Sequence, residues 1–206
     1  MRSIVTIQNK RSILFWGLGF VLLLGLAFSV SEYLARQWMP RTQTGFEIGA
    51  PFQLTDHTGQ IVTEEIFTGR ASAVFFGFTH CPEICPTTLN DLANARQALA
   101  EGREKLQIVF ITLDPERDTV EVLKDFIPYF GEQVTGITGK PENVLELARD
   151  WGIFWERIQT SGGGYTLDHT ATVFLLNEQG RMTGTIDIAE PPDVVEAKLK
   201  KLVTRL

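Results

Sequence analysis

Residues 71–86 read ASAVFFGFTHCPEICP. The first nine residues form a continuous apolar run rich in aromatic side chains, which is typical of a β-strand buried on both faces. Cys81 and Cys85, the only cysteines in the chain, follow directly. Proline is unfavourable inside a helix but tolerated at its first position, so we expect a helix to begin at Pro86 with Cys85 as its N-cap. A cysteine at a helix N-terminus has its thiolate form favoured by the helix dipole.

The elements on either side of this stretch alternate between strand and helix patterns. Strands alternating with helices imply a parallel central sheet, to which a trailing hairpin adds antiparallel strands. This is the element order of an α/β, thioredoxin-like domain with a central mixed sheet. In chain order we expect a hairpin around the turn DHTG (56–59), the strand 71–79, a helix 86–100, a buried strand 106–114, a helix from 118 to about 130, a helix 141–151, a hairpin of strands 165–177 and 182–188, and a helix 191–206.

Two polar segments lie in the predicted turns. In DPERD (114–118) we expect Pro115 to fix a turn and Asp118 to cap the next helix, with Glu121 completing a capping box. A second interpretation gives Asp114 a hydrogen bond that orients a ligand or a partner. His57 lies in the turn DHTG, and we expect its ring to face solvent.

An uncharged apolar stretch, residues 12–31, precedes the domain. As a helix of 20 residues it is long enough to cross the ~30 Å hydrocarbon layer of a membrane. Positive charges but no acidic residues precede it, so we predict a cytoplasmic N-terminus (1–11), a transmembrane anchor (12–31), a linker (32–45) and a domain (46–206). The domain then faces the periplasm or cell exterior from the inner (plasma) membrane. The alternative is a cleaved secretory signal.

Charge is divided unevenly along the chain. Residues 1–41 carry a net charge of +4, which leaves −10 for residues 42–206 against −6 for the whole chain. A domain this acidic lacks the clusters of Lys and Arg that bind phosphates, so we expect no nucleic-acid partner. Outside the cytoplasm two thiols can be oxidised, so Cys81 and Cys85 can cycle between a dithiol and a disulfide.

The C-x-x-x-C spacing favours chemistry over a structural crosslink, because a disulfide that closes so small a loop contributes only about 2 kcal/mol of stability. Two thiolates do not saturate most metal ions, and the chain has three histidines. His57 lies in a turn, and His80 points away from Cys81 if the strand continues, which leaves His169 as the third ligand. An ordinary surface histidine is the alternative. Two thiolates and one imidazole favour copper, especially Cu(I), whereas structural zinc normally takes four ligands.

Three motifs and the apolar N-terminal stretch make the sequence resemble the Sco/SenC family over about residues 46–204. The motifs are FFGFTHCPEICPTTL (75–89), ITLDPERDT (111–119) and DHT (168–170). The resemblance implies a thioredoxin-like fold that binds one copper ion, Cu(I) or Cu(II), through Cys81, Cys85 and His169. Thr170 replaces the commoner serine and keeps the hydroxyl group. The resemblance also implies a membrane-anchored copper chaperone that helps assemble the binuclear copper site of cytochrome c oxidase subunit II.

Two other activities use the same cysteines. A thiol-disulfide oxidoreductase that keeps the oxidase cysteines reduced needs Cys81 and Cys85 but makes no demand on His169. Peroxide reduction at Cys81 is a further alternative. None of the motifs identifies the protein that donates the copper.

Overall fold

The computed structural model describes residue 25 and residues 29–31 and 50–204. The predicted cytoplasmic N-terminus (1–11) lies outside the described residues, as do the linker (32–45) and most of the anchor (12–31). Within the described residues, no helix combines the length and the apolar character that a membrane crossing requires.

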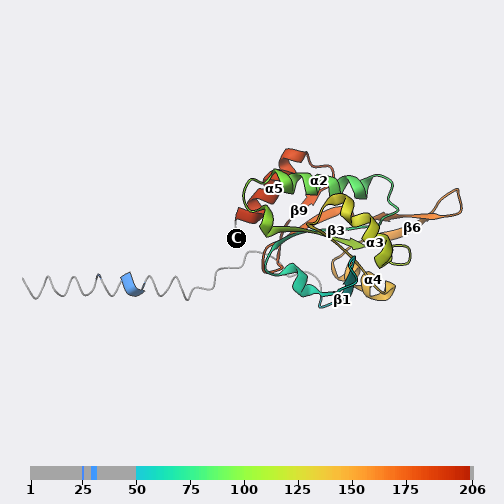
Figure 1. The fold of residues 1–206 in the computed structure, drawn as a ribbon, viewed down its shortest axis with the longest axis horizontal. Coiled ribbons are helices and arrows are strands. Elements are labelled where there is room, and N and C mark those ends of the chain that lie inside the picture. The colour runs from blue at the N-terminus through green and yellow to red at the C-terminus, as the bar shows by residue number, and fades with distance from the viewer. Residues whose placement is uncertain (1–24, 26–28, 32–49, 205–206) are drawn as a thin grey trace, which may run out of the picture. The chain divides into compact units, whose positions relative to one another are not determined.

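A mixed sheet forms the centre of the domain (Figure 1), and in the described part of the chain it has seven strands. Strands β3, β4 and β5 run parallel, while β1 and β8 run antiparallel to β5 and β3, respectively. The predicted α/β, thioredoxin-like arrangement with a mixed sheet is confirmed. Across the sheet the order is β2 (Ile61–Thr63), β1 (Gln53–Asp56), β5 (Val134–Thr138), β4 (Leu106–Thr112), β3 (Ala71–Gly77), β8 (Thr172–Leu176) and β9 (Met182–Asp187).

Helices cover both faces of this sheet. In Figure 1, α2 (Ile84–Ala98) and α5 (Pro192–Thr204) lie together on one face and α4 (Pro141–Asp150) lies on the other. After β4 comes α3 (Val120–Phe126), which continues as the 3-10 helix η3 (Ile127–Phe130) and so ends where the sequence predicts. Two shorter 3-10 helices, η1 (Glu64–Phe67) and η2 (Arg103–Lys105), precede β3 and β4.

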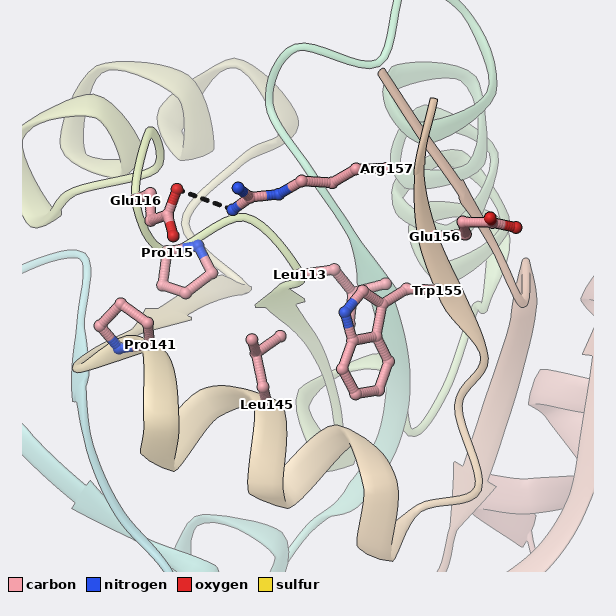
Figure 2. A pocket seen from close by; sticks show the side chains of 8 residues that line it. All are labelled: Leu113, Pro115, Glu116, Pro141, Leu145, Trp155, Glu156 and Arg157. Atoms are coloured by element: carbon pink, nitrogen blue, oxygen red, sulfur yellow. Dashed lines mark ion pairs between the residues drawn. The ribbon is translucent and has the colours of Figure 1, made fainter. Parts of the chain in front are cut away.

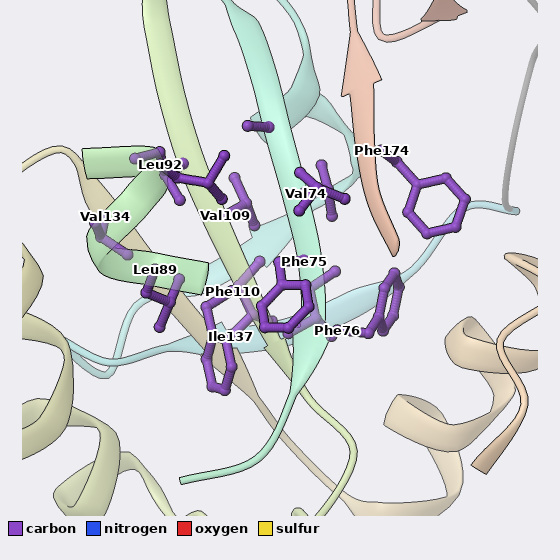
Figure 3. Packing of buried hydrophobic residues seen from close by; sticks show 14 of the residues in the cluster. Val74, Phe75, Phe76, Leu89, Leu92, Val109, Phe110, Val134, Ile137 and Phe174 are labelled. Atoms are coloured by element: carbon purple, nitrogen blue, oxygen red, sulfur yellow. The ribbon is translucent and has the colours of Figure 1, made fainter. Parts of the chain in front are cut away.

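The quoted strand lies at the centre of the core, and every residue of β3 and β4 is buried. Adjacent aromatic rings of β3 serve opposite faces (Figure 3): the ring centroid of Phe75 lies 6.3 Å from that of Phe110, and that of Phe76 lies 6.3 Å from that of Phe174. Burying each such side chain stabilises the fold by about 1.5–3 kcal/mol. The end of β3 is therefore a rigid support for the residues that follow.

The helix after the cysteines begins two residues earlier than predicted. Its first residue is Ile84 and its N-cap is Glu83, so Cys85 and Pro86 occupy the second and third helical positions. The first N–H groups of a helix have no partner within it, and the carbonyl that the proline ring would crowd belongs to Pro82, before the helix. Proline is therefore tolerated here without marking the first position.

The predicted strand 165–177 is two strands that belong to different sheets. Tyr165–His169 (β7) pairs antiparallel with Trp155–Gln159 (β6) in a separate two-stranded sheet, whereas β8 joins the main sheet. The polar β6 is mostly exposed, whereas the apolar β8 is mostly buried. The sequence thus does not predict the hairpin of β6 and β7. The turn of this hairpin contains the SGGG segment (161–164).

Asp118 does not cap the next helix. Thr119 is the N-cap, and its hydroxyl accepts a hydrogen bond from the Val122 N–H at 3.4 Å. The buried Asp118 carboxylate instead accepts hydrogen bonds from the Thr79 N–H at 2.9 Å and the Thr112 hydroxyl at 2.6 Å. It thereby joins the segments that follow β3 and end β4, directly beside the cysteine loop.

Candidate metal centre

Cys81 lies in the turn between β3 and α2, with its backbone N–H donating to the Phe78 carbonyl at 3.2 Å. The backbone N–H of Cys85 points back at the Cys81 sulfur at 3.4 Å. The hydrogen bond from the Cys85 thiol and those from backbone N–H groups at the start of α2 lower the pKa of Cys81 to about 5, although partial burial opposes the shift. Cys81 is therefore a half-buried thiolate at neutral pH, stabilised by the helix N-terminus.

Cys85 is fully buried, and both cysteines are free thiols. The hydrogen bond to the Cys81 thiolate raises the pKa of Cys85, and its burial raises it further. The two thiols titrate as a pair, in which the first proton leaves Cys81 and the second stays on Cys85. Cys85 lies against Gly77, the last residue of β3, where an added Cβ would come 2.9 Å from the Cys85 sulfur.

His169, the last residue of β7, brings an imidazole to this sulfur pair. Its Nε2 lies 3.8 Å from the Cys85 sulfur. Its Nδ1 lies 2.9 Å from the Thr170 carbonyl oxygen. A carbonyl only accepts, so Nδ1 carries a proton; in the neutral tautomer that this contact selects, Nε2 presents a lone pair toward Cys85.

Aromatic packing and the neighbouring threonine hold the imidazole in this orientation. The ring centroid lies 6.3 Å from that of Phe75 and 5.8 Å, edge to face, from that of Phe78. The Thr170 hydroxyl accepts from the Phe154 N–H at 3.1 Å, and the Thr170 N–H donates to the Phe154 carbonyl at 3.0 Å. The hydroxyl at this position therefore fastens the end of the hairpin to its start.

The other two histidines lie in different surroundings. The ring of His80 is half exposed, and its Nδ1 lies 3.1 Å from the Thr79 hydroxyl. His57 lies in the predicted turn, but its Nδ1 accepts a hydrogen bond from the Gly136 N–H of β5 at 3.2 Å. The ring is therefore half-buried and not fully solvent-facing as expected, because the start of the turn continues the pairing of β1 with β5.

The donor set fits a soft ion that takes few ligands. Within the described residues no three Cys, His, Asp or Glu side chains are already arranged around one metal position. A thiolate, a second thiol and an imidazole lone pair nevertheless meet at the end of β3, and these are the ligand types that favour Cu(I). Completing the site requires the loss of one proton from Cys85 and movement of the side chains toward one metal position.

A family model described as SCO1/SenC matches residues 40–204. The chain belongs to the SCO1/SenC family. Among its relatives, a SCO2-like protein of Rickettsia prowazekii is 36% identical over 137 residues, which cover 66% of this chain and 67% of that protein. A mitochondrial SCO1 homolog of Arabidopsis thaliana is 35% identical over 64% of this chain, which spans only 40% of its length. The structure of Bradyrhizobium japonicum ScoI with copper bound is similar with a TM-score of 0.69 and 34% identity, covering 75% of this chain and 99% of that one.

This SCO1/SenC protein also contains a polar cluster beside the site that connects the loop after β4 with the hairpin. Asp114, which is 1% exposed, accepts a hydrogen bond from the Tyr165 hydroxyl at 2.7 Å and forms an ion pair with Arg117. The Arg117 guanidinium lies 3.7 Å from the centre of the Tyr165 ring and donates to the Tyr165 carbonyl at 3.0 Å. Burial and the bond to Asp114 raise the pKa of Tyr165.

The sequence indicated one member of this cluster. The alternative role for Asp114, a hydrogen bond that orients a ligand or a partner, points to this place, but the carboxylate binds the hairpin. The sequence places Tyr165 in a strand and predicts no role for it, because nothing in the local pattern pairs it with a residue 51 positions earlier.

A cavity of about 310 Å³ lies beside the hairpin in the SCO1/SenC domain (Figure 2). The Glu116–Arg157 ion pair, 2.7 Å between Oε2 and Nη2, lies at its edge, and the Trp155 ring forms part of its wall. Trp155 is the residue that pairs with His169 across the hairpin. The lining residues are Leu113, Pro115, Glu116, Pro141, Leu145, Trp155, Glu156 and Arg157.

Proposed function

We propose that this protein is a membrane-anchored copper chaperone that binds one copper ion through Cys81, Cys85 and His169. We propose further that it delivers this ion during assembly of the binuclear copper site of cytochrome c oxidase subunit II. The observation that carries the proposal is the 3.8 Å approach of His169 Nε2, with its lone pair, to the sulfur of Cys85. Copper bound to a relative in the same family supports it.

Each ligand has a distinct part in taking up the ion. Cys81 presents a half-buried thiolate, so it contacts copper without losing a proton first. Cys85 then gives its proton to solvent, and its sulfur joins from the buried side. Copper is cargo in this scheme, and a site with three protein ligands leaves room for a ligand of the recipient, so the ion can pass by stepwise ligand exchange.

The membrane placement belongs to the same proposal. Residues 12–31 are uncharged and follow a positively charged start, which supports an anchor with a cytoplasmic N-terminus. The copper domain then lies on the periplasmic face of the inner membrane, or outside the cell.

His169→Ala tests the ligand set. In the reduced full chain, competition with a Cu(I) chelator measures the dissociation constant of the variant against that of the wild type. We expect copper affinity to fall by more than about 100-fold, since losing even a hydrogen-bond partner of a ligand costs about 10–100-fold. His57→Ala is the matched control, because its ring bonds to β5, and it should keep the wild-type affinity. An unchanged dissociation constant in His169→Ala refutes the third ligand.

A thiol-disulfide oxidoreductase is the second candidate, supported by the thiolate at Cys81 beside a free Cys85. The Cys81 thiolate attacks a substrate disulfide and releases one substrate thiolate. Deprotonated Cys85 then attacks the Cys81 sulfur and releases the other, so the substrate gains two electrons and the protein ends with a Cys81–Cys85 disulfide. Full rescue of an oxidase-deficient strain by His169→Ala would favour this activity over copper transfer.

A further inference from the structure

The hairpin that carries His169 is only weakly packed against the domain. Strands β6 and β7 form their own two-stranded sheet, separate from the main one. Four of the five β6 residues are exposed, and Leu167 is the buried residue of β7. A cavity lies between part of this sheet and α4 (Figure 2), although Arg149 of α4 lies over the Trp155 ring at 5.9 Å. Apolar contacts of the hairpin are therefore few: the rings of Phe75 and Phe78 beside His169, and the packing of Leu167, Trp155 and Tyr165 against the core.

At the other end of β7 from His169, polar contacts hold the hairpin, and we call Asp114, Arg117 and Tyr165 the hairpin latch. Tyr165 is the first residue of β7, and His169 is the last. The Tyr165 hydroxyl donates to the buried Asp114 carboxylate at 2.7 Å, and the guanidinium of Arg117 stacks on the same ring while it pairs with Asp114. Arg157 lies over the same ring at 4.6 Å and pairs with Glu116. The start of β7, next to the hairpin turn, is thus held by a charged, partly desolvated cluster on the loop after β4.

One nitrogen of the latch has no hydrogen-bond partner. Nη2 of Arg117 is buried and has no hydrogen-bond partner. A buried donor without a partner costs free energy that water would restore. Opening the hairpin would hydrate this nitrogen, so part of the cost of breaking the Tyr165–Asp114 bond is offset. The closed position is therefore favoured without being permanent.

We propose that the hairpin latch positions His169 for copper and sets the rate at which copper leaves. With the latch closed, β7 holds Nε2 against the Cys85 sulfur. When the latch opens, β7 tilts away from the loop after β4 and the imidazole leaves the copper ion. Two sulfurs then hold the ion, which the ligands of a recipient can reach. Arg117 and Tyr165 are positioning residues, since neither contacts the sulfurs. This inference rests on the proposed function, because it needs His169 to bind copper.

Tyr165→Phe in the full chain tests the latch, since it removes the hydroxyl bond to Asp114 and keeps the ring under Arg117. Tyr129→Phe is the matched control, the same chemical change at a side chain that is 84% exposed. Hydrogen exchange without copper reports hairpin opening, and stopped-flow transfer of Cu(I) to excess chelator reports release. Since a hydrogen bond to a charged group is at stake, we expect the amides of β7 to exchange, and copper to leave, about ten- to a hundredfold faster in Tyr165→Phe. Amides in α2 and both rates of Tyr129→Phe should match the wild type.

Two further variants separate the possible failures. Arg117→Lys keeps the charge but loses the stacked guanidinium, so it should speed β7 exchange and copper release in the same direction. In a His169→Ala background, Tyr165→Phe should not speed copper release further. Wild-type β7 exchange in Tyr165→Phe overturns the latch, as does faster exchange with unchanged copper release. If His169→Ala itself releases copper at the wild-type rate, the proposed ligand set fails, whereas the copper-free exchange result still decides whether the latch holds the hairpin.

Discussion

Gly77→Ala tests how tightly the end of β3 holds Cys85. A Cβ at this position would lie 2.9 Å from the Cys85 sulfur and 2.9 Å from Cε2 of Phe110, whereas ordinary contacts begin near 3.4 Å. The sulfur and the ring must therefore each retreat by about 0.5 Å, or the backbone must shift. The backbone does not resist the change, because Gly77 is not among the glycines with positive φ. The substitution is a test of packing alone.

The expected magnitude follows from overpacking a closed core. Inserting one methyl group into a well-packed interior costs about 1–3 kcal/mol, which for a domain of this size lowers Tm by roughly 2–12 °C. Metal sites tolerate changes of only about 0.2 Å in ligand distance, so we also expect Cu(I) affinity to fall by at least about tenfold. Urea unfolding of the copper-free protein and chelator competition measure the two effects separately.

Gly184→Ala is the matched control for this experiment. Gly184 also lies in a strand of the main sheet, and an added Cβ there meets no heavy atom within 4 Å. It should leave both stability and affinity at wild-type values. If Gly77→Ala instead unfolds at the wild-type urea concentration and binds copper as tightly, then Cys85 is not packed against β3, and the reasoning that places it beside His169 is wrong.

Two more expectations concern the cysteine loop and its support. Because the pKa of Cys81 is lowered to about 5, the rate of its alkylation by iodoacetamide should rise with a midpoint near pH 5 and stay flat from pH 7 to 8. The lowered pKa also stabilises the folded protein. This contribution is full above about pH 9 and is lost as pH falls through about 5. A rate that still climbs tenfold per unit at pH 7 would contradict the thiolate assignment. Asp118→Ala removes the acceptor for the Thr79 N–H and the Thr112 hydroxyl, so urea unfolding should show a loss of about 3 kcal/mol. A loss under about 1 kcal/mol would mean that the carboxylate does not join the two strands.

The β6–β7 hairpin shows where sequence reasoning stopped. Residues 165–177 have extended-strand propensity throughout, so one long strand was the natural prediction. The sheet that each half joins depends on which strands lie beside it in the folded protein. β7 pairs with β6, for which the local sequence pattern predicts no element. The N-cap of α3 is a similar case, because Asp118 has the chemistry of a cap but accepts hydrogen bonds from Thr112 at the end of β4 and from Thr79, 39 positions earlier.

The residues by themselves determined the buried strands and most helix positions, because long apolar runs and helical spacing act locally and outweigh their surroundings. They also indicated Cys81, Cys85 and His169 as the reactive set, since donor chemistry is a property of the side chains. Only the tertiary structure decided that the imidazole comes within 3.8 Å of one sulfur, that the proton pair divides unevenly between the cysteines, and that Tyr165 fastens the hairpin to Asp114. The first and the last depend on contacts between residues 84 and 51 positions apart, which no local pattern reveals. The uneven proton division depends on how the loop brings two nearby thiols together and on the burial of Cys85 in the folded core.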